Sequence, residues 1–506
     1  MRERDDSVTS DPLRSALDAW NTLGSATAIW WTRNAGPRAV AAAATNRSRD
    51  LIAFARAHSP FYRHAWRALK SGELSLGDVP VVRKRELMAS FDDWMTDRSV
   101  DRRGVEAFLA DRSHIGEYFL GRYVIWKSSG STREPGIFVQ DRAALATYDA
   151  LLAVQLQSAA WAGSYLSGLV AQGGRAALIA ATGDHFASIS SWQRICRGSP
   201  WPNARAFSVM EPLPMLVAAL NEYQPAFVAS YPTTLAMLAL EHRAGRLRIA
   251  PACLWSGGEY LSPAAHVDIE RAFGAVLVNE YGASECMSIA YSCARRSLHV
   301  NAEWVVLEPV DQEYRPVAPG QPSHTVLLTN LANRIAPIIR YDLGDSITCS
   351  AGPCGCGSPL PSIRAEGRCD DVLALASDDG TTVRLSPLAV TTVLEEAMPN
   401  GRFQLVQTGP GSLDLRISAA DDDGRQLAWR NAQAALQAYL AQQSLPNVQI
   451  RLADEAPMPD VRSGKLREVV AEHRAGDASI EESRFAVPLE RPEKAPGASR
   501  RGITTP

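Results

Sequence analysis

The stretch Val276-Leu-Val-Asn-Glu-Tyr-Gly-Ala-Ser-Glu285 joins a short apolar run to a polar segment that contains one glycine. The apolar run has the length and the β-branched residues of a buried strand. Similar runs begin at Ala176, Phe227 and Thr325, and they alternate with helix-like stretches between about residues 120 and 350. This alternation predicts an α/β architecture with layered sheets.

The segments on either side of this region have different patterns. Between Asn46 and Ala57 apolar residues recur at helix-like spacing, and Pro60 ends that helix because proline disfavours helix in the residue before it. After Arg368, strand-like runs begin at Phe403 and Leu413, and a helical pattern follows at about 430–442. These patterns predict a helical lead-in before the sheets and a small α+β domain behind them.

We therefore expect a large N-terminal multi-layer α/β domain over residues 12–368, with the helical lead-in reaching to about residue 100. A small, mobile C-terminal α+β domain is expected over residues 369–475. Residues 1–11 and 476–506 are expected to be disordered, and the C-terminal tail is rich in Pro, Glu, Arg, Gly and Ser.

Composition excludes several classes of protein. The chain of 506 residues exceeds the usual size of one hydrophobic core, and its formal net charge of −3 creates no field that would recruit nucleic acid. Acidic residues at the start and eight scattered cysteines favour a cytoplasmic protein with reduced thiols over a secreted one. The stretch Ala150–Gly174 lacks charge, but its Gln and Ser residues favour a core helix and a loop, so we expect no membrane span.

One loop has the composition of a phosphate-binding segment. Ser128-Ser-Gly-Ser-Thr-Arg-Glu-Pro-Gly136 follows the apolar run Tyr123–Trp126, and its hydroxyls and backbone N–H groups could wrap the oxygens of a polyphosphate. It lacks the Gly-Lys-Ser/Thr ending of the familiar phosphate loop. Alone, such a run is more often a solvated loop.

Further motifs follow this loop in a fixed order, and they are Ser256-Gly-Gly-Glu259, Asn279–Glu285, Arg340-Tyr-Asp-Leu-Gly-Asp345, Gly367-Arg-Cys-Asp-Asp371 and Ser463-Gly-Lys-Leu-Arg467. Together the motifs resemble those of the adenylate-forming (AMP-binding) superfamily of acyl-CoA synthetases. Ser59-Pro-Phe-Tyr62 and Leu360-Pro361 resemble the phenylacetate-CoA ligase-like branch of that superfamily. The resemblance covers about residues 45–470.

The resemblance implies an ATP-dependent ligase that converts a carboxylic acid to its acyl-AMP, releases pyrophosphate, and then transfers the acyl group to coenzyme A. An amine, a carrier-protein thiol or a cofactor hydroxyl are alternative acceptors. A non-catalytic nucleotide-binding module on the same fold is an alternative of another class. Only Arg133 favours that alternative, because it stands where the superfamily usually has glycine.

The resemblance also implies roles for individual residues. ATP or AMP would contact the residues Ser128, Ser129, Gly130, Ser131, Thr132, Gly257, Gly258, Glu259, Tyr281, Gly282, Ser284, Asp345 and Arg368. Glu285 would coordinate Mg²⁺, a cation that takes carboxylate and phosphate oxygens. Lys465 would be the catalytic cation from the small domain, and Asp370 would be the hinge.

A second group of residues has the chemistry of a metal site. Cys293 and His299 lie in one segment, and Cys354 and Cys356 lie in another downstream. Three thiolates and one imidazole match a closed tetrahedral zinc site, although buried free cysteines are also common. The resembled branch often has such a set at these places, which predicts a structural Zn²⁺. The remaining cysteines are interpreted as small apolar residues.

The pocket for the acid is the least defined part of the sequence. By position in the resembled fold, His185, Phe186, Trp192 and Tyr231 should line it. The alternative is that the aromatic residues belong to the core and that His185 is a loop histidine. No residue indicates which carboxylic acid is bound.

Overall fold

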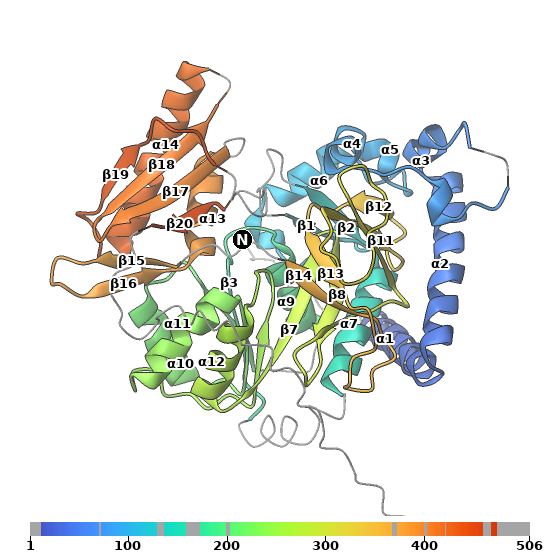
Figure 1. Cartoon of the computed structure of the whole chain (residues 1–506), viewed down its shortest axis with the longest axis horizontal. Coiled ribbons are helices and arrows are strands. Elements are labelled where there is room, and N and C mark those ends of the chain that lie inside the picture. Colours follow the sequence, from blue (N-terminus) through green and yellow to red (C-terminus); the bar gives the residue numbers. More distant parts are fainter. Residues whose placement is uncertain are drawn as a thin grey trace, which may run out of the picture.

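The computed structural model describes residues 12–69, 72–128, 136–157, 173–198, 203–366, 372–398, 402–419, 421–458 and 467–472. The segments 1–11 and 476–506, for which disorder was predicted, lie outside the described residues. Figure 1 shows a large body that contains most of the helices and strands, with a smaller unit of four-stranded sheet and helices beside it.

The chain begins with the predicted helical lead-in. It comprises α1 (Pro12–Asn34), α2 (Pro37–His58), α3 (Pro60–Ala65), α4 (Lys84–Ala89), α5 (Phe91–Trp94) and α6 (Arg102–Leu109). Tyr62 and Trp94 are fully buried, and both donate hydrogen bonds of 2.8 Å to the carbonyl oxygen of Pro337. These bonds attach the lead-in to the strand that follows Pro337, which carries the Arg340–Asp345 motif.

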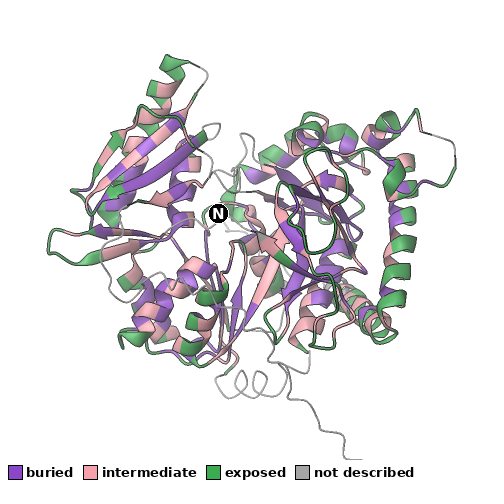
Figure 2. Cartoon of the chain, in the orientation of Figure 1, coloured by how far each residue is buried: buried purple, intermediate pink, exposed green. Residues whose placement is uncertain are grey.

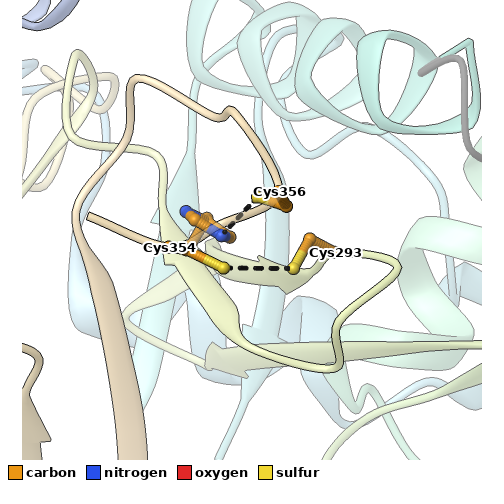
Figure 3. A group of neighbouring side chains, drawn as sticks. Cys293, Cys354 and Cys356 are labelled. Carbon is orange, nitrogen blue, oxygen red and sulfur yellow. Dashed lines mark hydrogen bonds between the residues drawn. The ribbon is translucent and has the colours of Figure 1, made fainter. Parts of the chain in front are cut away.

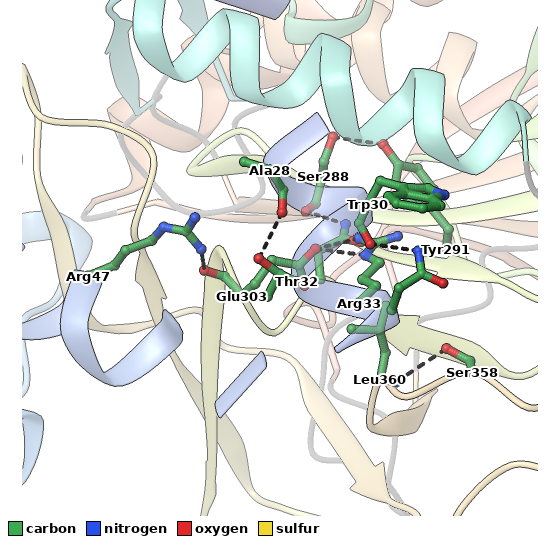
Figure 4. A network of polar contacts seen from close by, with 12 residues as sticks. Ala28, Trp30, Thr32, Arg33, Arg47, Ser288, Tyr291, Glu303, Ser358 and Leu360 are labelled. Carbon is green, nitrogen blue, oxygen red and sulfur yellow. Dashed lines mark hydrogen bonds and ion pairs between the residues drawn. The ribbon is translucent and has the colours of Figure 1, made fainter. Parts of the chain in front are cut away.

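Hydrogen bonds to Glu303 fix the first two helices to the large body. Glu303 is fully buried, and its Oε1 accepts a 2.7 Å hydrogen bond from Arg33 Nε of α1. Arg47 of α2 donates to the carbonyl oxygen of the same residue at 2.6 Å. Figure 4 shows the two arginines approaching Glu303 from different helices, near Ser288 and Tyr291. A buried carboxylate requires such partners, so these contacts define where the lead-in docks.

The central sheet has nine strands. In spatial order they are β13 (Ser346–Cys349), β14 (Ser362–Glu366), β9 (Leu298–Val300), β8 (Cys286–Ser292), β7 (Val276–Ala283), β6 (Cys253–Ser256), β5 (Phe227–Ser230), β3 (Ala176–Ala180) and β4 (Ala204–Ser208). The strands β3 to β7 are parallel neighbours, whereas β7, β8, β9, β14 and β13 pair antiparallel. The motif strand β7 therefore belongs to both halves of the sheet.

Helices cover both faces of the parallel half. One face, with Ala177 and Ile179 of β3, packs in one core with residues of α10 (Leu213–Tyr223), α11 (Pro232–Arg243) and α12 (Pro263–Phe273). The other face, with Leu178 and Ala180, packs against α1, α7 (Arg142–Leu156) and α9 (Ala187–Gly198). Burial on both faces explains why these strands read as continuous apolar runs and not as alternating ones (Figure 2).

Two further sheets complete the large body. β1 (Val124–Lys127) pairs with β2 (Ile137–Gln140), and β10 (Val305–Val310), β11 (Thr325–Asn330) and β12 (Ile338–Asp342) form a three-stranded sheet. They share one hydrophobic core with the helical lead-in and with β8. The loop between β1 and β2 is the one that begins at Ser128.

The smaller unit has an α+β composition. β19 (Gln449–Leu452), β18 (Ser412–Ser418), β17 (Arg402–Gly409) and β20 (Val469–Ala471) form its sheet in that order, with α13 (Pro387–Ala397), α14 (Asp422–Gln442) and the hairpin of β15 (Leu373–Ala376) and β16 (Thr382–Leu385). Gln443 donates a 2.8 Å hydrogen bond to the carbonyl oxygen of Met210 in the large body. The predicted fold class, a large α/β domain followed by a small α+β domain, is confirmed.

Within the described part of the chain, no helix is both long and apolar enough to cross a lipid bilayer. The uncharged stretch after α7 falls mostly on residues 158–172, which lie outside that part.

Candidate active site

A cavity of about 1690 Å³ collects residues from the separated motifs. It is lined by the ends of β1, β5, β6, β7 and β12 and by residues of α7, α9 and β17. The predicted site residues that line it are Ser128, Phe186, Trp192, Tyr231, Gly257, Gly258, Gly282, Ser284, Glu285 and Asp345. Residues far apart in the sequence are therefore brought to one site at the carboxyl ends of the parallel strands, where α/β folds place their ligands.

Two of the motif glycines are required by close contacts. Gly258 has a φ of +81°, and a Cβ atom there would lie 3.1 Å from the Tyr231 ring. A Cβ atom on Gly282 would lie 2.0 Å from the carbonyl oxygen of Met287, at the irregularity in the pairing of β7 with β8. A larger residue at either position would displace the wall of the cavity.

Glu285 and Asp345 each accept a hydrogen bond from a tyrosine. The hydroxyl of Tyr341 donates to Glu285 Oε1 at 2.7 Å, and the hydroxyl of Tyr281 donates to Asp345 Oδ2 at 2.9 Å. Glu285 is buried, and this burial raises the pKa of its carboxyl group. Tyr281 does not line the cavity but orients Asp345. Its contact with ATP or AMP stays a prediction.

The ends of the loop that begins at Ser128 are closed by hydrogen bonds. Ser128 donates its backbone N–H to the Gly136 carbonyl oxygen at 2.8 Å, and Ser128 Oγ accepts from the Gly136 N–H at 2.8 Å. Lys84 of α4 donates to Ser128 Oγ at 3.0 Å. Ser129, Gly130, Ser131 and Thr132 lie outside the described residues, so their contact with phosphate stays a prediction.

Lys84 is a cavity residue that the sequence analysis missed. A Cβ atom on Gly136 would lie 2.8 Å from Lys84 Cε, so the lysine stem fills the space beside this glycine. The ammonium group consequently lies beside the start of the loop. The only sequence signal was the run Arg83-Lys84-Arg85, which does not specify a partner.

Some predicted residues lie outside the cavity or outside the described chain. Glu259 accepts from the backbone N–H and the hydroxyl of Thr233, at 3.1 and 2.7 Å, in the first turn of α11. His185 is buried, with Nε2 3.1 Å from the Asp111 carbonyl oxygen, and burial lowers its pKa. Arg368, Asp370 and Lys465 lie outside the described residues.

The predicted metal ligands form a compact group away from the cavity. The ligand atoms of Cys293, His299, Cys354 and Cys356 all lie within 4.8 Å of one another. Cys293 Sγ lies 3.9 Å from Cys354 Sγ, and Cys356 Sγ lies 3.3 Å from His299 Nε2 (Figure 3). The group thus joins the connection between β8 and β9, together with His299 of β9, to the connection between β13 and β14.

The geometry of this group fits a tetrahedral metal ion. Two sulfurs that are each ~2.3 Å from a tetrahedral zinc ion lie ~3.8 Å apart, which is close to the distance between Cys293 and Cys354. His299 Nδ1 lies 2.9 Å from the Leu360 carbonyl oxygen and would donate its proton there. That bond would leave Nε2 free to bind a metal ion, the arrangement usual for zinc-bound histidines.

No protein-family model matches the chain, and no curated protein matches it. Solved structures do match. 2-Hydroxyisobutyryl-CoA ligase, in complex with 2-HIB-AMP and CoA in the thioesterification state, has a TM-score of 0.51 and 20% identity over 85% of this chain and 89% of its own. Amide bond synthetase McbA from Marinactinospora thermotolerans has a TM-score of 0.36 and 16% identity, covering 68% and 67% of the two chains. The first similarity shows that this chain has the fold of that ligase, as the ordered motifs predicted.

Proposed function

We propose that the chain is an adenylate-forming ligase that activates a carboxylic acid as its acyl-AMP with release of pyrophosphate. The observation that carries this proposal is the convergence of Ser128, Gly257, Glu285 and Asp345 on one cavity. These residues come from four motifs whose order along the chain resembles that of the superfamily. The shared fold supports the proposal, and the chemistry of the lining residues carries it further than fold alone could.

The proposed reaction brings two anions together, because the acid carboxylate attacks the α-phosphate of ATP. Catalysis of such a step is mostly positioning and neutralisation of charge. Lys84, beside Ser128, supplies a cation at the phosphate end of the cavity. Lys465 is proposed to supply a second cation from the small domain, and Arg368 a third near ribose or phosphate.

The carboxylate of Glu285 fits the role of a Mg²⁺ ligand. It lies in the cavity wall, and one of its oxygens accepts a single hydrogen bond from Tyr341. A carboxylate offers about four acceptor positions, so this bond leaves capacity for a cation. Mg²⁺ would neutralise phosphate charge when ATP is bound. Asp345, held by Tyr281, would accept hydrogen bonds from the ribose hydroxyls.

We propose coenzyme A as the acyl acceptor, presented after the small domain moves about Asp370. An amine, a carrier-protein thiol and a cofactor hydroxyl are the alternative acceptors, and each would leave a different product. Zn²⁺ is proposed to bind the Cys293, His299, Cys354 and Cys356 group as a structural ion. Four protein ligands would leave no open position for catalysis.

The test is pyrophosphate release by the purified full-length chain with ATP, Mg²⁺ and a panel of aromatic and aliphatic acids. Release that depends on one class of acid supports the proposal. Addition of coenzyme A, then of simple amines, identifies the acceptor from the product formed. ATP binding without acid-dependent pyrophosphate release for any acid would instead favour the non-catalytic nucleotide-binding module.

A further inference from the structure

One acidic residue of the cavity has no role in the adenylation site described above. Glu280 lines the cavity from β7, one residue before Tyr281. Successive residues of a strand point to opposite faces, so Glu280 and Gly282 face the cavity while Tyr281 faces Asp345. The Glu280 side chain therefore reaches the cavity, whereas the side chain of Tyr281 does not line it.

The surroundings of Glu280 are apolar and aromatic. Trp255, Tyr291 and Phe227 belong to one hydrophobic cluster, with ring centroids 5.4 Å apart for Trp255 and Tyr291 and 6.4 Å apart for Phe227 and Trp255. All three also line the cavity, together with the aliphatic residues Leu152, Leu178 and Ile195. This aromatic and aliphatic lining has the chemistry of a pocket for an organic ring.

In the described part of the chain, two hydrogen-bond donors lie near the Glu280 carboxylate. Its Oε2 accepts a 2.8 Å hydrogen bond from Trp255 Nε1. The hydroxyl of Tyr291 is also close enough to interact with the Glu280 carboxylate. That hydroxyl donates its hydrogen bond to Ser288 Oγ at 2.8 Å, and both residues are labelled in Figure 4. Among the described residues, no lysine, arginine or histidine forms an ion pair with Glu280.

Two cations that line the cavity are paired with other acids. Arg194 donates to both carboxylate oxygens of Asp149, at 3.0 and 2.6 Å. Lys127 Nζ lies 2.9 Å from Asp184. Both pairs line or border the cavity, and each satisfies its own charge. Glu280 is thus a carboxylate in an apolar pocket with acceptor capacity that these cations do not take up.

A structural role alone does not explain a carboxylate at this position. The indole N–H of Trp255 needs one acceptor, which a neutral amide would provide without the cost of burying a charge. Burial raises the pKa of Glu280 to about 7, which reflects that cost. A carboxylate that is kept in a ligand pocket at such a cost indicates a ligand that donates to it.

We propose that Glu280 determines specificity in the acid pocket by accepting a hydrogen bond from an amino or hydroxyl substituent of an aromatic carboxylic acid. The inference rests on the proposed adenylation function and extends it to a substrate class. The aromatic walls hold the ring, and the substituent remote from the reacting carboxylate meets Glu280. The same contact excludes rings that present a methyl group there, since the buried carboxylate would remain unpaired.

The test compares matched acids. Pyrophosphate release by the wild-type chain is measured with the 3- and 4-isomers of aminobenzoate, hydroxybenzoate and methylbenzoate. Phenylacetates with the same three substituents form a second series, and straight-chain aliphatic acids form a third. A site that hydrogen-bonds a substrate donor discriminates against an analogue without that donor far more strongly than an apolar pocket discriminates against a missing methylene. We therefore expect kcat/KM for the best amino or hydroxyl acid to exceed that for its methyl counterpart by at least ~100-fold.

Two variants test whether Glu280 causes the preference for amino or hydroxyl acids over methyl acids. Glu280→Met should reduce the ratio to about 10-fold or less by removing the acceptor. Glu280→Gln keeps an acceptor for Trp255, so it carries the test if the methionine variant does not fold, and it should lower the ratio at least ~10-fold. Glu222→Gln, an exposed residue of α10, is the charge-matched control and should keep the wild-type ratio.

The two possible failures have different signatures. Turnover of methyl or aliphatic acids at least equal to that of donor-bearing acids would overturn the assignment of Glu280 while leaving adenylation intact. A preference that survives unchanged in both Glu280 variants would overturn it as well. Absence of pyrophosphate release with every acid would overturn the adenylation function, and with it the substrate class.

Discussion

The hydroxyl of Tyr341 lies 2.7 Å from Oε1 of Glu285 and donates a hydrogen bond to it, although the two residues are 56 positions apart in the chain. Tyr341 belongs to the Arg340–Asp345 motif, and Glu285 ends the motif on β7. One motif therefore orients the carboxylate that another motif provides. This contact links the two nucleotide motifs into one site and fixes the proposed metal ligand in the cavity wall.

Glu285→Gln should weaken Mg²⁺-dependent turnover far more than it weakens folding. The amide is nearly isosteric but is a poor Mg²⁺ ligand, so kcat/KM should fall by about 10²–10³. Because burial raises the pKa of Glu285, the neutral amide should not lower the melting temperature. A Mg²⁺ titration of pyrophosphate release measures the first effect and thermal unfolding the second. Full activity of the variant at low Mg²⁺ would exclude the metal role.

Lys84→Met should lower kcat/KM for ATP by about 10²-fold, because the variant keeps the apolar stem beside Gly136 and removes the ammonium group from the phosphate end. Arg38→Met, on the exposed face of α2, is the matched control and should keep wild-type activity. Steady-state kinetics with ATP as the varied substrate gives the comparison. Equal activity of the two variants would exclude a role for Lys84 in the reaction with ATP.

Purified chain should contain one zinc ion per molecule, bound by Cys293, His299, Cys354 and Cys356. Cys356→Ser should lose the metal and lower the melting temperature by at least about 5 °C, since metal binding contributes to folding stability. Cys349→Ser, outside the group, is the control and should retain zinc. Elemental analysis that finds no zinc in the wild-type protein would contradict the site.

The stability difference between wild type and Glu280→Gln should depend on pH. Burial raises the pKa of Glu280 from 4.5 to about 7, so the native state binds more protons than the unfolded state between these values. The stability that this carboxyl group contributes to the native state is therefore lost as the pH rises from about 4.5 to about 7. The glutamine variant has no such pH-dependent contribution. Its free energy of unfolding relative to wild type should therefore increase between about pH 4.5 and about pH 7. Thermal unfolding of both chains at about pH 5 and about pH 8 measures it, and a pH-independent difference would exclude the buried, proton-binding carboxyl group.

The sequence alone predicted the layers, which depend on local patterns, and it named the motif residues that form part of the cavity wall. Continuous apolar runs predicted the strands β3, β5, β7 and β11, and the ordered motifs predicted that Glu285 and Asp345 serve one site. The metal-ligand group was named from the sequence because three thiolates and one imidazole match a tetrahedral zinc site and because the resembled branch often has such a set at these places.

The contacts that the sequence did not predict are those between elements with no shared pattern. Lys84 reaches Ser128 from a helix 44 positions earlier. Glu280 was quoted within the β7 motif but given no role, because its apolar surroundings come from Trp255 and from other strands. Phe186, Trp192 and Tyr231 line the cavity, whereas His185 lies outside its lining and contacts the Asp111 carbonyl oxygen. Their role in binding the acid stays a prediction.

The central claim is tested most directly by acid-dependent exchange of labelled pyrophosphate into ATP. Exchange requires reversible formation of acyl-AMP, so it reports adenylation without any acceptor. The account predicts exchange in the wild-type chain with Mg²⁺ and an accepted acid, and its loss in Lys465→Ala. Absence of exchange with every acid, or ATP cleavage to ADP and phosphate, would contradict it.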